Sequence, residues 1–372
     1  MRILLLSDFF YPHISGGAIA RFKFAEEAVK RGNKVVVFTP MRGGYEKRED
    51  IKGIEIRRPF RNKPEGMVPD HPIALFTRFF YSILFFFKLS RWLKRKKVDH
   101  IQTTEHIFHP IGKLLGKIFE IPVLSFVGYT PSLSGDESFF ERLIFKHFLG
   151  DKVLCRSEGV KDKIERLSDS RVKVVHGVIN RDSIERILDQ VDVREKRKKL
   201  GFDGDDIVLT MVGRLTPVKN IERGIEILSE LPERYKLLIV GDGPEREMIE
   251  KKVASLGLRE KVIMLGRVGH EEAIKIMAAS DMIMLTSKAE AYPTVVFEAL
   301  ALGKKVVATP VGILKEISEE NLFVDITQNF PTIIGNMDFG KRNTQIDENM
   351  ISRYGMERYT EETLDFMREN HG

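Results

Sequence analysis

The sequence is poor in cysteine: Cys155 is the single one among 372 residues. A lone cysteine excludes an internal disulfide and a cluster of thiolate ligands, and it fits a reducing cytoplasm. The chain also lacks a long hydrophobic run, because its most apolar stretch, 79–87, is much shorter than the roughly 20 residues that span a bilayer. No cleavage-site pattern follows the first residues, so we expect them to form a strand and not a signal peptide.

Motifs that define several other enzyme classes are missing as well. No GxGxxG follows the first predicted strand, which argues against a nicotinamide enzyme, and no HExxH or paired cysteine suggests a metal. The run GKLLGK at 112–117 is one residue short of a P-loop and lacks its Ser or Thr. Asp203-Gly204-Asp205 precedes a predicted strand within a charged stretch, and we interpret it as a turn. We therefore expect neither a metal ion nor a cofactor.

The length and the hydrophobic pattern predict two domains of α/β class. At 372 residues the chain is about twice the usual domain size. Apolar strands alternate with helices in both halves, as in parallel sheets covered by helices. We place an N-terminal domain at 1–178 and a C-terminal domain at 179–345, with the connection in the charged stretch 180–205. The segment 346–372 is predicted to be helical.

The stretch EAYPTVVFE at 290–298 carries two carboxylates around a predicted helix start. Pro293 precedes an apolar helix that Gly303 ends, so Glu290 lies on the loop before the helix and Glu298 lies one turn inside it. Free amide groups at a helix N-terminus can bind a diphosphate, and flanking carboxylates can accept hydrogen bonds from sugar hydroxyls. The alternative is one capping and one solvated glutamate on an ordinary helix.

Two cations and several glycines follow other predicted strands. Arg214 comes directly after a strand and Lys219 five residues later, where they would stabilise a departing nucleoside diphosphate or lie on the surface without a role. The turn 241–244, GDGP, also links a strand to a helix and is either a close approach to a ligand or a plain tight turn. Gly16-Gly17 precedes the first helix and either offers amides to a phosphate or the acceptor, or has a structural role alone.

Four stretches taken in order resemble family 4 glycosyltransferases of the GT-B fold, namely VGRLTPVKN, IVGDGPE, MLGRVGHEEAIKIMAASDMIMLTS and EAYPTVVFEALALGKKVVATPVG. The resemblance implies two Rossmann-like domains facing across a cleft, with the last helix crossing back to the first domain. It implies a retaining, metal-independent hexosyltransferase that uses a nucleoside-diphosphate sugar and an acceptor hydroxyl.

The resemblance also assigns roles to residues. Its implied catalytic residues are Arg214, Lys219 and Glu290. Its implied donor-binding residues are Gly16, Gly17, Gly213, Gly241, Gly243, Arg267, Val268, Pro293, Thr294, Val295 and Glu298. At Arg267 and Val268 the backbone would contact the nucleobase. Two positions depart from the family pattern: Gly128 stands where many relatives have a histidine, and His176 replaces a common asparagine.

Two other functions remain open at this point. A GT-B sugar-nucleotide epimerase would release a rearranged sugar without an acceptor. A noncatalytic nucleotide-sugar binding protein would carry out no reaction, and Gly128 makes it conceivable.

The segment from Phe76 to Lys97 predicts an interfacial amphipathic helix. Its basic residues are Lys88, Arg91, Lys94, Arg95, Lys96 and Lys97, and no acid lies among them. Its apolar residues with helical spacing are Phe85, Leu89, Trp92 and Leu93. Such a helix would associate with anionic lipid on the cytoplasmic face of a membrane and bring a lipid-linked acceptor near. The alternative is a core helix with a solvated basic end. No nucleic-acid motif is present.

Overall fold

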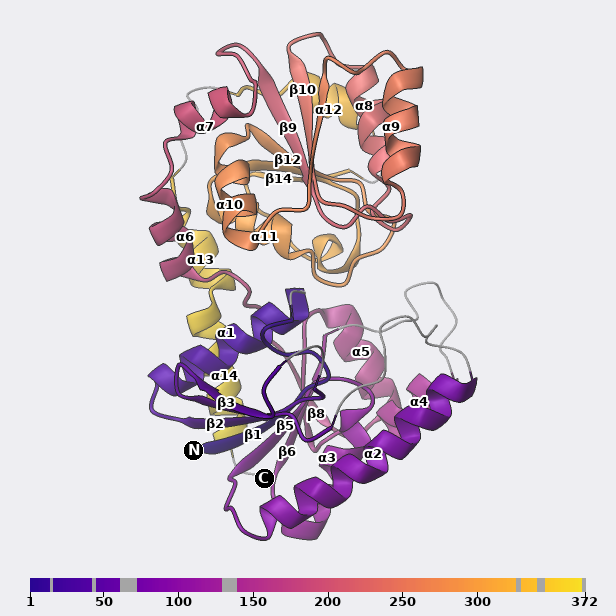
Figure 1. The fold of residues 1–372 in the computed structure, drawn as a ribbon, viewed down its shortest axis with the longest axis vertical. Coiled ribbons are helices and arrows are strands. Elements are labelled where there is room, and N and C mark those ends of the chain that lie inside the picture. The colour runs from indigo at the N-terminus through magenta and orange to yellow at the C-terminus, as the bar shows by residue number, and fades with distance from the viewer. Residues whose placement is uncertain are drawn as a thin grey trace. The chain divides into compact units, whose positions relative to one another are not determined.

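The computed structural model describes residues 1–13, 16–41, 45–60, 72–128, 139–325, 329–339 and 345–369. The chain divides into two compact units (Figure 1). The first unit comprises Met1–Gly177 and Met356–Gly372, and the second comprises Val178–Gly355. Each has its own sheet and hydrophobic core.

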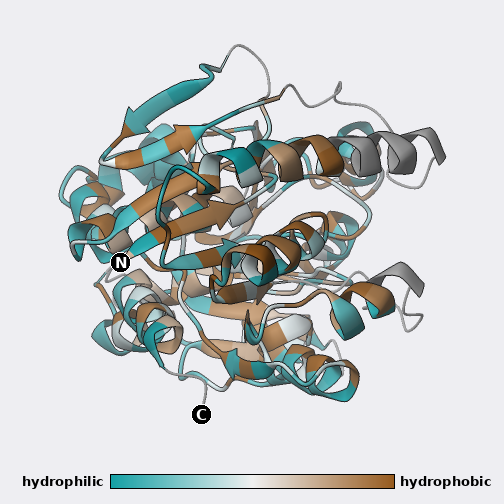
Figure 2. Ribbon diagram, turned by 90° about the horizontal axis from the view of Figure 1, so that it is seen from below, coloured by the Kyte–Doolittle hydropathy of each residue, from teal (hydrophilic) through white to brown (hydrophobic). Residues whose placement is uncertain are grey.

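The first unit is built on a mostly parallel sheet with the strand order β3-β4-β2-β1-β5-β6-β7-β8. Its strands are β1 (Arg2–Leu6), β2 (Lys34–Phe38), β3 (Arg48–Ile51), β4 (Ile54–Arg57), β5 (His100–Thr103), β6 (Val123–Val127), β7 (Lys152–Cys155) and β8 (Arg171–Val174). The central strands are buried and apolar on both faces because helices cover both sides, as expected of a parallel sheet. In Figure 2 the central strands are mostly hydrophobic, whereas the helices carry both hydrophobic and hydrophilic residues.

An antiparallel hairpin at one edge of this sheet departs from the parallel pattern that we expected. Strands β3 and β4 pair antiparallel, and β4 continues the sheet by pairing parallel to β2. Lys52 and Gly53 both have positive φ, 54° and 78°, which is the backbone that a two-residue type I′ turn requires. The short, charged β3 is only partly buried, so the sequence carries no hydrophobic run that marks it as a strand.

The helices of the first unit include α14, which comes from the far end of the chain. They are α1 (Gly16–Lys30), α2 (Pro72–Leu93), α3 (Phe108–Phe119), α4 (Phe139–His147), α5 (Glu158–Leu167) and α14 (Met356–Arg368). Helix α14 packs on α1, where Phe24 meets Tyr359 edge to face. Its carboxyl end is bound by the buried Lys152, whose ammonium donates to the carbonyls of Phe366 and Met367.

The predicted helical segment 346–372 is two helices that belong to different units. Helix α13 (Glu348–Tyr354) lies in the second unit and α14 lies in the first. Gly355 separates them in an extended conformation and pairs with Ile179 in an isolated parallel bridge. A side chain at Gly355 would overlap the carbonyl of Ile351, so the chain can turn here because this residue is glycine.

The second unit contains a six-stranded, wholly parallel sheet with the order β11-β10-β9-β12-β13-β14. Its strands are β9 (Ile207–Val212), β10 (Tyr235–Val240), β11 (Val262–Gly266), β12 (Met282–Leu285), β13 (Lys305–Ala308) and β14 (Leu322–Val324). Its helices are α6 (Arg181–Leu188), α7 (Val193–Lys199), α8 (Ile221–Ser229), α9 (Arg246–Ser255), α10 (His270–Ala279), α11 (Thr294–Ala301), the 3₁₀ turn η2 (Gly312–Lys315), α12 (Phe330–Gly335) and α13.

The charged stretch 180–205 is not the interdomain connection that we expected. It forms α6 and α7, both within the second unit, and the boundary falls between Gly177 and Val178. The stretch is charged because short capped helices expose most of their residues. Asn180 caps α6 and Asp192 caps α7.

Helix α2 exposes its cations but buries the apolar residues that we expected to face lipid. Phe85, Leu89 and Leu93 lie in the core of the first unit, and the Trp92 ring meets Phe38 edge to face at 5.2 Å. Its described side chains begin at Ser82, so the predicted segment from Phe76 to Tyr81 is outside the described side chains. In the described part of the chain, no helix is long and apolar enough to cross a membrane.

A series of hydrogen bonds links buried polar side chains between helix α3 and the first sheet. His109 is 1% exposed on α3, where its Nδ1 lies 2.7 Å from the hydroxyl of Thr103. That hydroxyl lies 3.1 Å from Ser125, whose Oγ accepts the amide hydrogen of Gly150. The residues around His109 in the sequence do not indicate this buried partner on β5.

His109 should make stability depend on pH. Burial lowers its pKa from the ordinary 6.5 to about 3. Between pH 6.5 and 3 the imidazole is therefore protonated in the unfolded chain but neutral in the folded protein. The free energy of unfolding falls as the pH falls through this window. We expect this residue to account for a loss on the order of 4 kcal/mol across that window. Urea unfolding of wild type and His109→Asn at several pH values measures it; parallel pH profiles would contradict it.

Candidate functional site

Apart from Gly16 and Gly17, which belong to the first unit, the predicted catalytic and donor-binding residues gather at one edge of the second sheet. All strand pairings in this sheet are parallel, so the carboxyl ends of β9, β10, β11 and β12 lie at the same edge. The four loops that follow these strands carry the predicted residues. This edge is where open parallel α/β sheets bind their ligands.

The loop after β9 holds Lys219 in place through its backbone. Asn220 adopts a left-handed conformation with φ of 51° at the start of α8. The hydroxyl of Thr286, just after β12, donates to the carbonyls of Lys219 and Asn220. The amide of Lys288 also donates to the carbonyl of Val218 at 2.8 Å. The loops after β9 and β12 are therefore tied together, while Arg214 is exposed beside them.

Lys219 and Glu290 form an ion pair across these two loops. The Glu290 side chain is 16% exposed and that of Lys219 is 25% exposed, so the pair is partly withdrawn from water. Ser287 donates to the same Glu290 oxygen at 2.9 Å. Two residues that the sequence predicts for one site, 71 positions apart, are thus in direct contact.

Helix α11 begins where the sequence predicted. Pro293 occupies the N-cap position and its side chain does not cap the first amides of this helix, which include Thr294 and Val295. Glu298 lies inside the helix with its side chain 15% exposed, and its Oε1 lies 2.7 Å from Nε2 of His270. A cap-free helix start between two carboxylates therefore lies on the edge that carries Lys219.

Glycines bring the backbones of three loops close together. Gly241 has φ of 143°, and its amide donates to the carbonyl of Gly266 at 2.8 Å. A side chain at Gly241 would overlap the carbonyl of Gly213, and one at Gly243 would overlap that of Leu215. These glycines are required by backbone packing. Arg267 is exposed and Val268 is half-buried in the neighbouring loop after β11.

Four residues of this edge were not singled out from the sequence. They are Thr286, Ser287, His270 and Gly312. Gly312 allows η2 to pack on the Glu290 loop, since a side chain there would overlap the carbonyls of Glu290 and Ala291. Their contacts join segments far apart along the chain. Only Gly312, in the run TPVG after a strand, could have been suspected as a turn glycine.

The predicted residues of the first unit lie at the carboxyl edge of its own sheet. Gly16 and Gly17 open α1 and are exposed. Gly128 follows β6, and a side chain there would press on the ring of Phe126. Phe126 in turn packs on the guanidinium of Arg156 at 5.2 Å, so the aromatic ring occupies the space beside Gly128. His176 is half-buried, and burial lowers its pKa.

Two family models match the chain in its two halves. Residues 14–183 match Glycosyltransferase Family 4, and residues 192–326 match Glycosyl transferases group 1. Together they cover most of both units.

Curated relatives span nearly the same length. The chain is 28% identical over 334 residues to an uncharacterized glycosyltransferase of Methanocaldococcus jannaschii, covering 85% of this chain and 82% of that one. It is 26% identical over 343 residues to the alpha-monoglucosyldiacylglycerol synthase of Streptococcus pneumoniae, covering 87% and 74%.

Solved structures share the fold. HepE of Anabaena, solved with UDP, superposes with a TM-score of 0.75 at 18% identity, covering 98% of this chain and 99% of that one. The same protein with UDP-glucose gives a TM-score of 0.73 at 19% identity. The two parallel-sheet units and the matching family models lead to one conclusion: the chain is a glycosyltransferase of family 4, group 1, with the GT-B fold.

Proposed function

We propose that this glycosyltransferase moves a hexose from a nucleoside-diphosphate sugar to an acceptor hydroxyl, with retention at the anomeric carbon and without a metal ion. The observation that carries the proposal is the Lys219–Glu290 pair beside the cap-free start of α11. It combines a cation for a phosphate, a carboxylate for a sugar hydroxyl and free backbone amides at one edge of a sheet.

Each predicted residue then has a chemical task. Arg214 and Lys219 neutralise charge that develops on the departing diphosphate, which is the task of a divalent cation in other transferases. The amides of Thr294 and Val295 bind a phosphate oxygen. Glu290 accepts hydrogen bonds from the sugar, and Glu298 accepts them from the ribose. The backbone near Arg267 and Val268 contacts the base, and the glycines allow this close approach.

The reaction needs no protein nucleophile. The bond between the anomeric carbon and the β-phosphate oxygen breaks, and the acceptor oxygen bonds to the same face of that carbon. The acceptor proton passes to the departing phosphate oxygen. The protein contributes positioning and charge stabilisation.

Two relatives support the choice of substrates. HepE, which shares the fold, was solved with UDP-glucose, and this favours a nucleotide-sugar donor. The streptococcal relative is by its name a glycolipid synthase, and this favours a lipid or lipid-linked acceptor. The comparisons do not favour an epimerase or a noncatalytic binding protein, since the relatives reported above are glycosyltransferases or synthases.

A thermal-shift screen tests the donor assignment. A nucleoside diphosphate at 100 times its Kd should stabilise the second unit by about 2.7 kcal/mol, or roughly 5–10 °C in Tm. UDP, GDP, ADP and dTDP are compared with their mononucleosides, which lack the diphosphate. If none of the four diphosphates raised the Tm more than its nucleoside does, the assignment of a diphosphate-binding site would be wrong.

We also propose reversible association with the anionic cytoplasmic face of a membrane, through a surface that differs from the one predicted. The exposed apolar side chains on α2 and α3 are Phe87 (64%), Ile118 (54%) and Leu114 (49%). The exposed cations that follow or lie near them include Lys88, Arg91, Lys94, Arg95, Lys96, Lys97 and Lys117. Cations attract anionic lipid, and the few apolar groups can enter the headgroup boundary.

Replacing Lys94, Lys96 and Lys97 by Gln should weaken partitioning onto anionic vesicles by roughly 100-fold. Each cation near such a surface contributes about 1 kcal/mol, and salt screens the attraction. The matched control replaces three exposed cations of the second unit, Arg194, Lys198 and Lys199. Cosedimentation across a salt series measures both variants. Absent binding at low salt, or equal loss in both variants, would contradict the proposed surface.

A further inference from the structure

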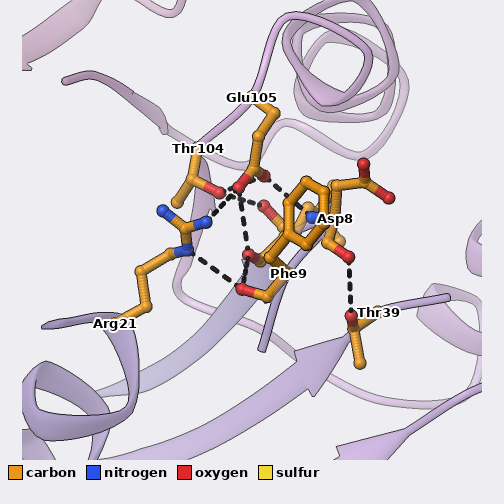
Figure 3. A network of polar contacts seen from close by, with 8 residues as sticks. Asp8, Phe9, Arg21, Thr39, Thr104 and Glu105 are labelled. Carbon is orange, nitrogen blue, oxygen red and sulfur yellow. Dashed lines mark hydrogen bonds and ion pairs between the residues drawn. The ribbon is translucent and has the colours of Figure 1, made fainter. Parts of the chain in front are cut away.

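A polar network fills the carboxyl edge of the first sheet, where β1 and β5 end (Figure 3). Its centre is the carboxylate of Glu105, in the loop between β5 and α3, and its main partner is Arg21 on α1. The Glu105 side chain is 22% exposed and that of Arg21 is 16% exposed. Neither residue was singled out from the sequence, and no task in the proposed reaction uses them.

The partly buried Glu105 carboxylate accepts several hydrogen bonds, as a charged group requires. It accepts hydrogen bonds from Arg21 and from the hydroxyl of Thr104, and its Oε2 accepts the amide hydrogen of Asp8 at 2.8 Å. Ser7 adds a longer bond of 3.4 Å. Burial raises the pKa of Glu105, and the charge of Arg21 opposes that rise. Charged pairs that are this well bonded hold their surroundings in one geometry.

What the pair holds is the start of the loop that links β1 to α1. Glu105 binds the amide of Asp8, while Nε of Arg21 donates to the carbonyl of Phe9 at 3.2 Å. Ser7 donates to the same carbonyl at 2.9 Å. The loop after β1 is therefore fixed by side chains that reach it from α1 and from the loop after β5 (Figure 3).

The glycine pair at the start of α1 is linked to the same network. A side chain at Gly17 would lie 3.0 Å from Nη1 of Arg21. Glycine at this position thus leaves room for the guanidinium beside Glu105. The exposed backbone of Gly16-Gly17 and the loop 7–9 are consequently parts of one assembly at the edge of the sheet.

We propose that the Arg21–Glu105 pair positions the loop 7–9 and the Gly16-Gly17 backbone to receive the acceptor hydroxyl. This rests on the proposed function, the transfer of a sugar to an acceptor hydroxyl, and it assigns the acceptor to the first unit. Because Glu105 neutralises Arg21, the pair itself adds no positive charge that would attract an anion, and this fits an uncharged acceptor hydroxyl. Both residues act through the loop and do not touch the reacting atoms.

A double-mutant cycle tests this positioning role. Arg21→Met or Glu105→Leu alone leaves one charge buried without its partner and should destabilise the fold. The double variant removes both charges and should recover most of the stability. Its kcat/KM for the acceptor should stay roughly 10- to 100-fold below wild type, because the loop is no longer held and small displacements are costly to catalysis.

Two further measurements separate the outcomes. Nucleoside-diphosphate Kd should be unchanged in the double variant, and hydrogen exchange at the Asp8 amide should quicken at least 10-fold. The matched control removes the exposed Lys113–Asp151 pair of the same unit and should alter none of these values. A stable double variant with wild-type acceptor kinetics would overturn the positioning role alone. A wild-type protein that transfers no sugar would overturn the proposed function instead.

Discussion

Changing Arg214 or Lys219 to Ala is expected to lower turnover by roughly 100-fold or more, by analogy with the loss of one oxyanion-hole donor. Each cation would face charge that builds up on the diphosphate as the bond to the sugar breaks. That charge is larger in the transition state than in the bound donor, so the loss should fall on kcat. Steady-state rates at saturating donor measure it.

The structure refines the controls for these two variants. Arg214 is exposed, so its removal should leave the fold intact. Lys219 is paired with Glu290, which would keep Ser287 as its partner in the variant. Lys251→Ala, an exposed cation on α9, is the matched control and should retain full activity. Normal turnover in both site variants would refute the leaving-group assignment.

The two carboxylates should separate donor binding from sugar reactivity. Glu298→Ala is expected to weaken binding of the free nucleoside diphosphate by roughly 10-fold or more, since a charged group hydrogen-bonded to ligand contributes about 1.5–3 kcal/mol. Glu290→Ala is expected to leave that Kd nearly unchanged and to lower turnover of the intact nucleotide sugar. Calorimetry with the diphosphate and kinetics with the sugar nucleotide give the two values.

His270 provides an internal check on Glu298. It lies 2.7 Å from Glu298 Oε1, so His270→Ala should loosen that carboxylate and weaken diphosphate binding less than Glu298→Ala does. The reverse pattern for the two carboxylates would exchange their roles. If binding and turnover were unchanged in both the Glu290→Ala and Glu298→Ala variants, the two residues would be one capping and one solvated glutamate without a role in the reaction.

The strand-and-loop order of the second unit could be predicted because its signals are local. Helix α11 begins after Pro293 and ends before Gly303, as proline and glycine dictate. The strands before Gly213 and Gly241 could be predicted as well, because they are largely apolar and end at a glycine turn. Parallel pairing then brings their carboxyl ends together, so a common edge for the predicted residues followed from topology.

What could not be predicted depends on contacts between distant segments. The charged β3 is a strand because Lys52-Gly53 turns it onto β4. Trp92 and Phe85 have the spacing of a lipid-facing stripe, yet they cover the first sheet, since a core-facing stripe has the same period. The partners of Glu105, Glu298 and His109 lie 84, 28 and 6 residues away, and spacing does not reveal such pairs.

Product analysis tests the central claim most directly. The protein is incubated with the donor selected by thermal shift, with and without a hydroxyl acceptor such as diacylglycerol in vesicles, and the products are identified by NMR. We predict a glycoside that forms only with acceptor and keeps the donor's anomeric configuration, at the same rate in EDTA. A rearranged sugar released without acceptor, or a product of inverted configuration, would contradict the account.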